Sequence, residues 1–258
     1  MLRLKNLILP CILLVSSVQA MPGKSRLFVS HYENVLGTSL EIKVAALSEK
    51  AADDAENAAL TEIERLNKIL SAYDKKSEFS QWLATRNRAV PVSKELLEVL
   101  SLFDQWRTKS NGALNASAEV INGLWKKAAK RQALPTAGEL STAVQQAQLK
   151  QWELDPVHQT ATRLSDAPLM LNSFAKSYVI RHAADAALAS PDVNGVAVNI
   201  GGDIVIKGQM SESVMITDPK ANAENEAPMT GIQLTNKAIA TSGNYRRGEQ
   251  IGNKWYSH

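Results

Sequence analysis

Helical and strand patterns are unevenly distributed along this chain, and the distribution limits the folds open to it. Apolar residues at helical spacing predict helices in the first three quarters, and short alternating strands follow one another after Pro191. Because strands and helices do not alternate regularly, we expect an α+β fold with helices packed on a mixed or antiparallel sheet, and not a doubly wound parallel sheet. The predicted helices span about 48–70, 93–109, 118–130, 136–149 and 174–188.

Strand predictions rest on alternation bounded by turn residues. Residues 26–47 alternate with a period of two and carry a tight turn at Leu36-Gly37-Thr38. Residues 152–154 and 161–164 are expected to pair, and residues 169–172 to form a short strand that leads into the last helix. The remaining predicted strands are 196–200, 204–207, 214–217, 232–235, 238–240 and residue 254 onward.

The N-terminus has the three parts of a secretory signal in order. Arg3 and Lys5 precede an apolar run over 7–18, which is too short to span a bilayer, and Val18-Gln19-Ala20 offers a cleavage site. We therefore predict a signal peptide over 1–20, a domain over 21–258 and a periplasmic location. The single cysteine, Cys11, lies inside the signal, so the mature chain has no disulfide, thiolate nucleophile or cysteine-ligated metal. A lipid anchor on Cys11 is the alternative, although Leu9 and Pro10 are not the small residues that such a signal needs.

Composition supports a globular protein that does not bind nucleic acid. With 45% hydrophobic and 21% charged residues among 258, the chain can bury a substantial core. Its net charge is only +3, and its basic residues form short clusters without interleaved aromatics. A nucleic-acid groove needs a denser basic face.

Common catalytic motifs are absent from the sequence. It has no phosphate-binding Walker loop, no His-Glu-x-x-His and no Gly-x-Ser-x-Gly, and its four histidines lack metal-ligand spacing. Gly201-Gly202-Asp203 does not match Gly-x-Gly-x-x-Gly and no helix follows it, so it favours a hairpin turn, which also leaves room for a ligand.

Two single residues have both a structural and a functional interpretation. Lys176 lies in the first turn of a predicted helix, where a cation opposes the helix dipole unless an anion lies nearby. It is either an exposed lysine or a phosphate ligand. Tyr73 follows the end of the first long helix, where it either packs locally or offers a ring face for stacking.

Seven short motifs taken together in order resemble the FAD:protein FMN transferase (ApbE) family. No single motif is specific, but the series covers nearly the whole mature chain. The motifs are Leu36-Gly-Thr38, Leu70-Ser-Ala-Tyr73 with Ser77-Glu78, Ser110-Asn-Gly-Ala-Leu-Asn115, Leu171-Asn-Ser-Phe-Ala-Lys-Ser-Tyr178, Val198-Asn-Ile-Gly-Gly-Asp203, Ala240-Thr-Ser-Gly-Asn-Tyr245 and Tyr256-Ser-His258.

The resemblance implies an ApbE-like domain that takes FAD and Mg²⁺. It would move the FMN part of FAD onto a threonine or serine hydroxyl of an acceptor flavoprotein and release AMP, a phosphoryl transfer that depends on positioning and charge neutralisation. Any association with the inner membrane would come only through the acceptor.

The resemblance also assigns residues. Lys176 would lie near the FAD phosphates, His258 would serve as a base, and the Ser173 carbonyl would bind the metal. The residues expected along the FAD are Leu36, Tyr73, Ala113, Leu114, Asn115, Met170, Lys176, Thr241, Ser242 and Gly243.

Several positions depart from the family pattern. The family has an acid where Asn115 stands, Asp where Met170 stands and Gly where Ser177 stands, and methionine cannot hydrogen-bond as a carboxylate does. The family also continues past the final histidine with Ile-Ile-Asp-Pro-Arg-Thr-Gly and a helix that carries Asp and Thr metal ligands. We therefore expect a domain without its C-terminal part, in which magnesium binds poorly.

Three hypotheses follow. The first is an FMN transferase, and the second is an FAD-binding protein without transferase activity because the C-terminal metal ligands are missing. The third is a catalytically inactive scaffold that binds a partner through the edge near 254–258.

Overall fold

A five-stranded antiparallel sheet forms the central layer of the computed structural model, which describes residues 24–216, 228–242 and 248–257. Its strand order is β1-β2-β6-β7-β10. Alternation in β2 buries Leu40, Ile42 and Val44 on one face, and this pattern fixes the register in which Leu40 lies opposite Ile200. The strands are β1 Arg26–Val35, β2 Thr38–Ala46, β6 Val193–Ile200, β7 Asp203–Gly208 and β10 Ala238–Ile239.

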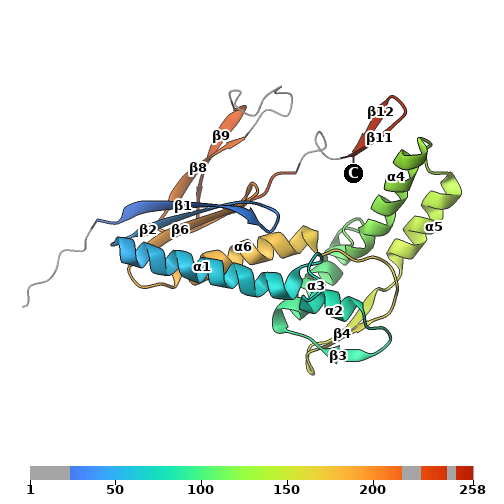
Figure 1. The fold of residues 1–258 in the computed structure, drawn as a ribbon, viewed down its shortest axis with the longest axis horizontal. Coiled ribbons are helices and arrows are strands. Elements are labelled where there is room, and N and C mark those ends of the chain that lie inside the picture. The colour runs from blue at the N-terminus through green and yellow to red at the C-terminus, as the bar shows by residue number, and fades with distance from the viewer. Residues whose placement is uncertain (1–23, 217–227, 243–247, 258) are drawn as a thin grey trace, which may run out of the picture.

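Two long helices, α1 (Glu49–Leu70) and α6 (Asn172–Leu188), cover one face of this sheet (Figure 1). Ser48 caps α1 by accepting a hydrogen bond from the Ala51 amide. Both helices carry fully buried alanines, such as Ala59 and Ala183, which let the helices approach closely.

A second layer of smaller elements surrounds an aromatic cluster. It contains α2 (Glu78–Leu83), α3 (Lys94–Lys109) and a three-stranded sheet of β3 (Ala89–Pro91), β5 (Thr160–Arg163) and β4 (Trp152–Asp155). The Trp152 indole donates a 3.0 Å hydrogen bond to Asp104. Burial raises the pKa of Asp104 above its ordinary value, and the Trp152 hydrogen bond opposes that rise. The clustered rings belong to Phe79, Trp82, Phe103, Trp152 and Phe174.

Helices α4 (Glu119–Arg131) and α5 (Ala137–Gln148) form an antiparallel arm that follows a short 3₁₀ turn, η1 (Ala116–Ala118). Thr136 and Glu139 form a capping box at the start of α5, and Arg131 at the end of α4 pairs with Glu139. The Arg131 hydrogen bond and the Thr136 amide lower the pKa of Glu139 to about 2. Glu139 therefore links the start of α5 to the end of α4 and stabilises the turn between the two helices.

Two hairpins complete the fold. The hairpin of β8 (Ser211–Ile216) and β9 (Thr230–Thr235) lies on the second face of the main sheet, where the Lys43 ammonium is 2.7 Å from the Glu212 carboxylate (Figure 1). The hairpin of β11 (Gly248–Ile251) and β12 (Lys254–Ser257) lies instead beside α4. No helix in the described part of the chain is long and apolar enough to cross a membrane.

The structure confirms the α+β prediction and the five predicted helices. The strand predicted over 169–172 is wrong: Leu171 is the N-cap of α6 and Asn172 begins the helix. A backbone hydrogen bond from the Met170 amide to the Ala116 carbonyl joins this segment to another part of the chain, but it does not belong to a β-ladder. Sequence analysis also missed α2, which Ser77 caps, because six residues are too few to show a helical period. The predicted signal peptide lies outside the described residues.

Candidate functional site

Two tight turns meet at one end of the main sheet. The β1–β2 turn places Leu36 and Gly37 at φ of 51° and 79°, and the β6–β7 turn places Gly201 and Gly202 at 54° and 87°. These left-handed values suit glycine and confirm both predicted turns. A Cβ built on Gly201 would lie 2.8 Å from Cγ2 and from Oγ1 of Thr38, so the absence of a side chain allows the two turns to touch.

Lys176 reaches from α6 to the second of these turns. Its ammonium lies 2.8 Å from the Asp203 carboxylate and 3.3 Å from the Gly201 carbonyl oxygen. The predicted need for a nearby anion is met by Asp203, the first residue of β7. Since an ammonium has three N–H donors and these partners take two, one donor is left for a further acceptor.

Tyr73 joins the same end of the sheet through the first residue of α6. Its hydroxyl accepts a 3.3 Å hydrogen bond from the Asn172 side-chain amide, while 78% of the residue is exposed. An exposed ring held by its hydroxyl is a candidate stacking surface. Asn172 and the adjacent Ser173 are exposed, and no side chain caps the first turn of α6.

A backbone hydrogen bond links the segment with Ala113, Leu114 and Asn115 to the residues that precede α6. Ala116, which follows Asn115, accepts a hydrogen bond from the Met170 amide. The Asn115 side chain hydrogen-bonds to neighbouring backbone groups. Its amide donates to the Ala147 carbonyl at 2.8 Å, and its oxygen accepts from the Ser117 amide. A carboxylate at this position could not donate to the Ala147 carbonyl, which also accepts a hydrogen bond from the Ser117 hydroxyl.

The register of β10 brings Thr241 and Ser242 to the same end of the sheet. Ile239 lies opposite Ile204, and β10 runs antiparallel to β7 toward the Gly201 turn. The two exposed residues that follow therefore leave the sheet beside that turn. Gly243 and His258 lie outside the described residues, so their predicted places remain predictions.

Sequence reasoning missed three residues of this cluster. Asp203 binds Lys176, Asn172 binds Tyr73, and Thr38 packs on Gly201. The signal for Asp203 was its position directly after a Gly-Gly turn, a position that places a carboxylate at the sheet end. The other two contacts carry no sequence signal, because they join residues from distant segments.

The residues in the described ranges do not fit a magnesium site. No group of three or more histidine, cysteine, aspartate or glutamate side chains converges there, and the carboxylate of Asp203 already pairs with Lys176. Magnesium prefers several hard oxygens in octahedral geometry. The Ser173 carbonyl therefore stays a metal ligand predicted from the resemblance only.

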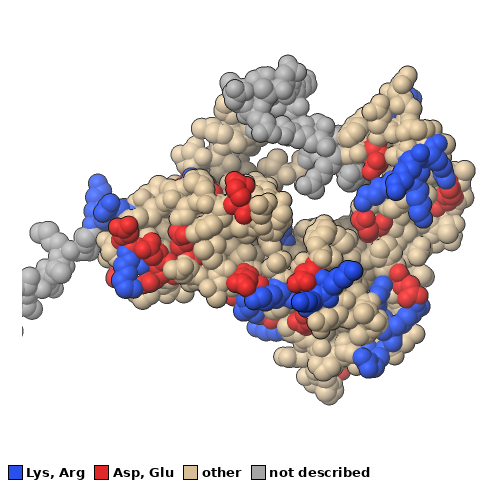
Figure 2. All heavy atoms as spheres, viewed as in Figure 1, with Lys and Arg blue, Asp and Glu red and all other residues tan. Residues whose placement is uncertain are grey.

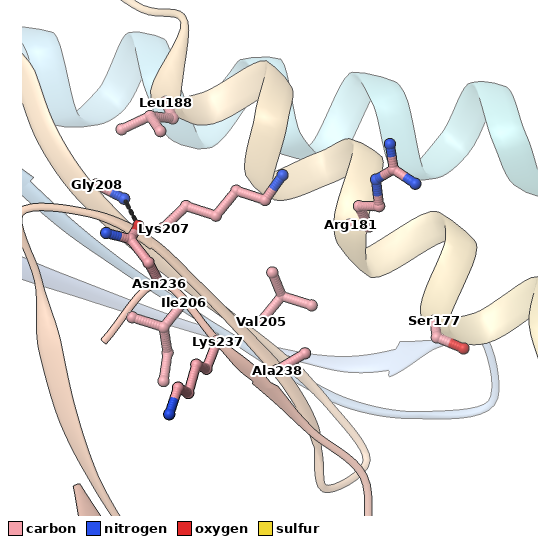
Figure 3. A pocket seen from close by; sticks show the side chains of 10 residues that line it. All are labelled: Ser177, Arg181, Leu188, Val205, Ile206, Lys207, Gly208, Asn236, Lys237 and Ala238. Atoms are coloured by element: carbon pink, nitrogen blue, oxygen red, sulfur yellow. Dashed lines mark hydrogen bonds between the residues drawn. The ribbon is translucent and has the colours of Figure 1, made fainter. Parts of the chain in front are cut away.

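A separate cavity of about 490 Å³ opens between α6 and the β7–β10 edge (Figure 3). Ser177, the residue after Lys176, lines this cavity, which extends from there along the basic side chains of Arg181 and Lys207. Because Tyr73, Lys176 and the Gly201 turn do not line it, we place the candidate site at the sheet end and not in this cavity.

The sequence and the fold are both similar to those of known proteins. The model of the ApbE family matches residues 36–258. The FAD:protein FMN transferase of Klebsiella pneumoniae (strain 342) is 20% identical over 231 residues, covering 86% of this chain and 66% of that protein. The enzyme of the same name from Vibrio cholerae (strain O395) is 28% identical over 210 residues, covering 77% and 61%.

Solved structures share the fold. The ApbE protein of Thermotoga maritima superposes with a TM-score of 0.74 at 22% identity, over 90% of this chain and 75% of that one. The flavin transferase ApbE of Vibrio cholerae gives 0.65 at 20% identity, over 89% and 75%. The chain spans somewhat less than two thirds of the length of the curated relatives it matches. Since the family model covers most of the sequence, the chain belongs to the ApbE family.

Proposed function

We propose that this protein transfers the FMN part of FAD to a threonine or serine hydroxyl of an acceptor flavoprotein and releases AMP. The observation that supports it most is the convergence of Lys176, the Gly201 turn and Tyr73 at one sheet end. Relatives that match most of this chain carry the name FAD:protein FMN transferase.

The geometry suggests how the substrate would lie. The third N–H of the Lys176 ammonium would donate to a phosphate oxygen of FAD, and the exposed ring of Tyr73 would stack on a flat ring of the same molecule. Asp203 and the Gly201 carbonyl hold the ammonium in place, so its charge need not be reoriented as the reaction proceeds.

Transfer would form one bond and break one. The acceptor hydroxyl oxygen attacks the phosphorus of the FMN part, the pyrophosphate P–O bond breaks, and AMP leaves with the electron pair. The hydroxyl proton would pass to His258, which we propose as the base. Lys176 would stabilise the negative charge on the phosphate oxygens.

The test is incubation with FAD, Mg²⁺ and a purified acceptor domain, followed by a search for fluorescent flavin on a denaturing gel. Lys176→Ala should abolish the fluorescent band. Lys207→Ala is the matched control, because Lys207 also joins α6 to β7 by pairing with an aspartate, Asp185, but lies away from the turns. Equal loss in both variants would show a structural role for Lys176 and contradict the proposal.

Tyr73→Ala tests the binding half separately. We expect weaker FAD binding with an unchanged fold, because most of the Tyr73 ring is exposed. A stacked base contributes about 1–3 kcal/mol, so affinity should fall by roughly fivefold to about 150-fold. Unchanged affinity in a fluorescence titration would remove Tyr73 from the site.

Binding without transfer is the second candidate. The Asn115 side chain is engaged by Ser117 and Ala147, Met170 has no polar side-chain group, and the described residues form no carboxylate cluster for a metal. FAD that co-purifies while the acceptor stays unlabelled, with or without added Mg²⁺, would favour it. We also propose a periplasmic location from the signal pattern over 1–20.

A further inference from the structure

The loop between α1 and α2 has a backbone that is held by local hydrogen bonds. The Ser71 hydroxyl accepts from the Tyr73 amide at 3.2 Å and from the Asp74 amide at 3.1 Å. The Ser71 carbonyl in turn accepts from the hydroxyls of Ser77, the buried N-cap of α2, and Ser80. These bonds fix where the backbone of Tyr73 lies, but they leave the direction of its ring undetermined.

Packing does not fix the direction of the Tyr73 ring either. Charged side chains of both signs surround the end of α1 in Figure 2, so the loop lies at the molecular surface, and 78% of Tyr73 is exposed. An exposed side chain changes rotamer within picoseconds to nanoseconds unless a specific contact holds it.

Asn172 supplies such a contact. Its side-chain amide donates the 3.3 Å hydrogen bond to the Tyr73 hydroxyl, which is the one side-chain hydrogen bond that Tyr73 makes within the described residues. Asn172 is well placed for this, because it is the first residue of a 17-residue helix that packs on α1 and on the main sheet. The ring is therefore tied at its far end to a rigid element.

We propose that Asn172 is a positioning residue for ring stacking. Without touching the ligand, it holds the Tyr73 ring in the direction in which a flat ring of FAD stacks on it. This inference rests on the proposed transferase function and on the place of Tyr73 in its site. A side chain that is free before binding has to be ordered when the ligand binds, and this ordering reduces affinity. A ring that is already held avoids most of that loss.

FAD titration of Asn172→Ala measures the effect. We expect binding about twofold to about tenfold weaker than wild type, which corresponds to the cost of ordering one side chain on binding. Asn122→Ala is the matched control, because it truncates another helix asparagine, one whose side chain bonds to Glu119 on α4. This control should bind FAD as wild type does. Unchanged affinity in Asn172→Ala would overturn the proposal.

A double-mutant cycle separates positioning from direct contact. Once the ring or its hydroxyl is removed, Asn172 has nothing to hold. Adding Asn172→Ala to Tyr73→Ala or to Tyr73→Phe should therefore weaken FAD binding no further. If Asn172→Ala cost the same factor in the Tyr73→Ala background as in wild type, Asn172 would contact FAD itself, and the proposal would be overturned.

Fluorine NMR of protein labelled with 3-fluorotyrosine gives a readout that does not depend on FAD. The chain has five tyrosines, and the Tyr73 resonance is the one that disappears in Tyr73→Phe. Asn172→Ala should narrow this resonance and move it toward that of free fluorotyrosine, while the other tyrosine resonances stay in place. An unmoved resonance would overturn the proposal.

The two kinds of failure are distinguishable. A wild-type chain that binds no FAD would contradict the proposed function, and the fluorine spectrum would still decide whether Asn172 holds the ring. A wild-type chain that binds FAD with an affinity insensitive to Asn172→Ala would contradict the positioning role alone. Urea unfolding should give the same midpoint for Asn172→Ala and wild type, because Asn172 and Tyr73 are both exposed.

Discussion

Replacing Gly201 with alanine would test whether the two turns must touch for the sheet end to form. The new Cβ would meet two atoms of Thr38 at 2.8 Å, a distance that real Cβ atoms essentially never show. The residue would also have to keep a φ of 54°. The left-handed backbone costs roughly 1–2 kcal/mol for a residue with a side chain. Overpacking adds typically ~1–3 kcal/mol, so we expect about 2–5 kcal/mol of destabilisation.

Gly202 provides the matched control for this variant. It has a φ of 87°, but a Cβ built there meets nothing within 4 Å. Gly202→Ala should therefore cost only the backbone part, about 1–2 kcal/mol. Adding Thr38→Ala to Gly201→Ala removes both close atoms and leaves the Thr38 Cβ at 3.2 Å, so most of the packing part should be recovered.

Urea unfolding followed by circular dichroism measures these differences through the midpoint at constant m-value. FAD titration of each variant shows whether the Lys176 partner has moved, since the Gly201 carbonyl accepts from its ammonium. If Gly201→Ala were no less stable than Gly202→Ala, contact with Thr38 would not limit the turn, and the reasoning would be refuted.

Two further variants probe the scaffold. Asn115→Asp removes one donor to the Ala147 carbonyl, which still accepts from the Ser117 hydroxyl, so the change should cost only about 0.5–1.5 kcal/mol in the same urea assay; unchanged stability would show that this bond contributes nothing. A hydrogen bond from Arg65 lowers the pKa of Glu62 below 4.5, so the ionised form stabilises the fold above that pH and this contribution is lost as the pH falls through the folded-state pKa. Glu62→Gln should therefore lower Tm at pH 7 and lower it progressively less as the pH falls below 4.5, and a loss of Tm that does not shrink with falling pH would contradict the assignment.

The sequence by itself determined the elements that depend on local pattern. Ser48 and Ser93 each accept a hydrogen bond from a first-turn amide of the helix they precede, and the two glycine-containing turns have the left-handed backbone they require. The order of short motifs identified the family without any knowledge of contacts. Such signals survive in a sequence because each one involves residues within a few positions of one another.

Only the tertiary structure decided which distant groups meet. It paired Lys176 with Asp203, turned Asn115 toward Ala147, and placed β12 on α4 instead of on the main sheet. None of these contacts follows from propensity or periodicity, because each joins segments whose approach is set by the packing of whole elements. The physical reason is that many groups along the chain could pair with a given charge or amide. Strand register and the burial of whole elements bring only one of them within hydrogen-bonding distance.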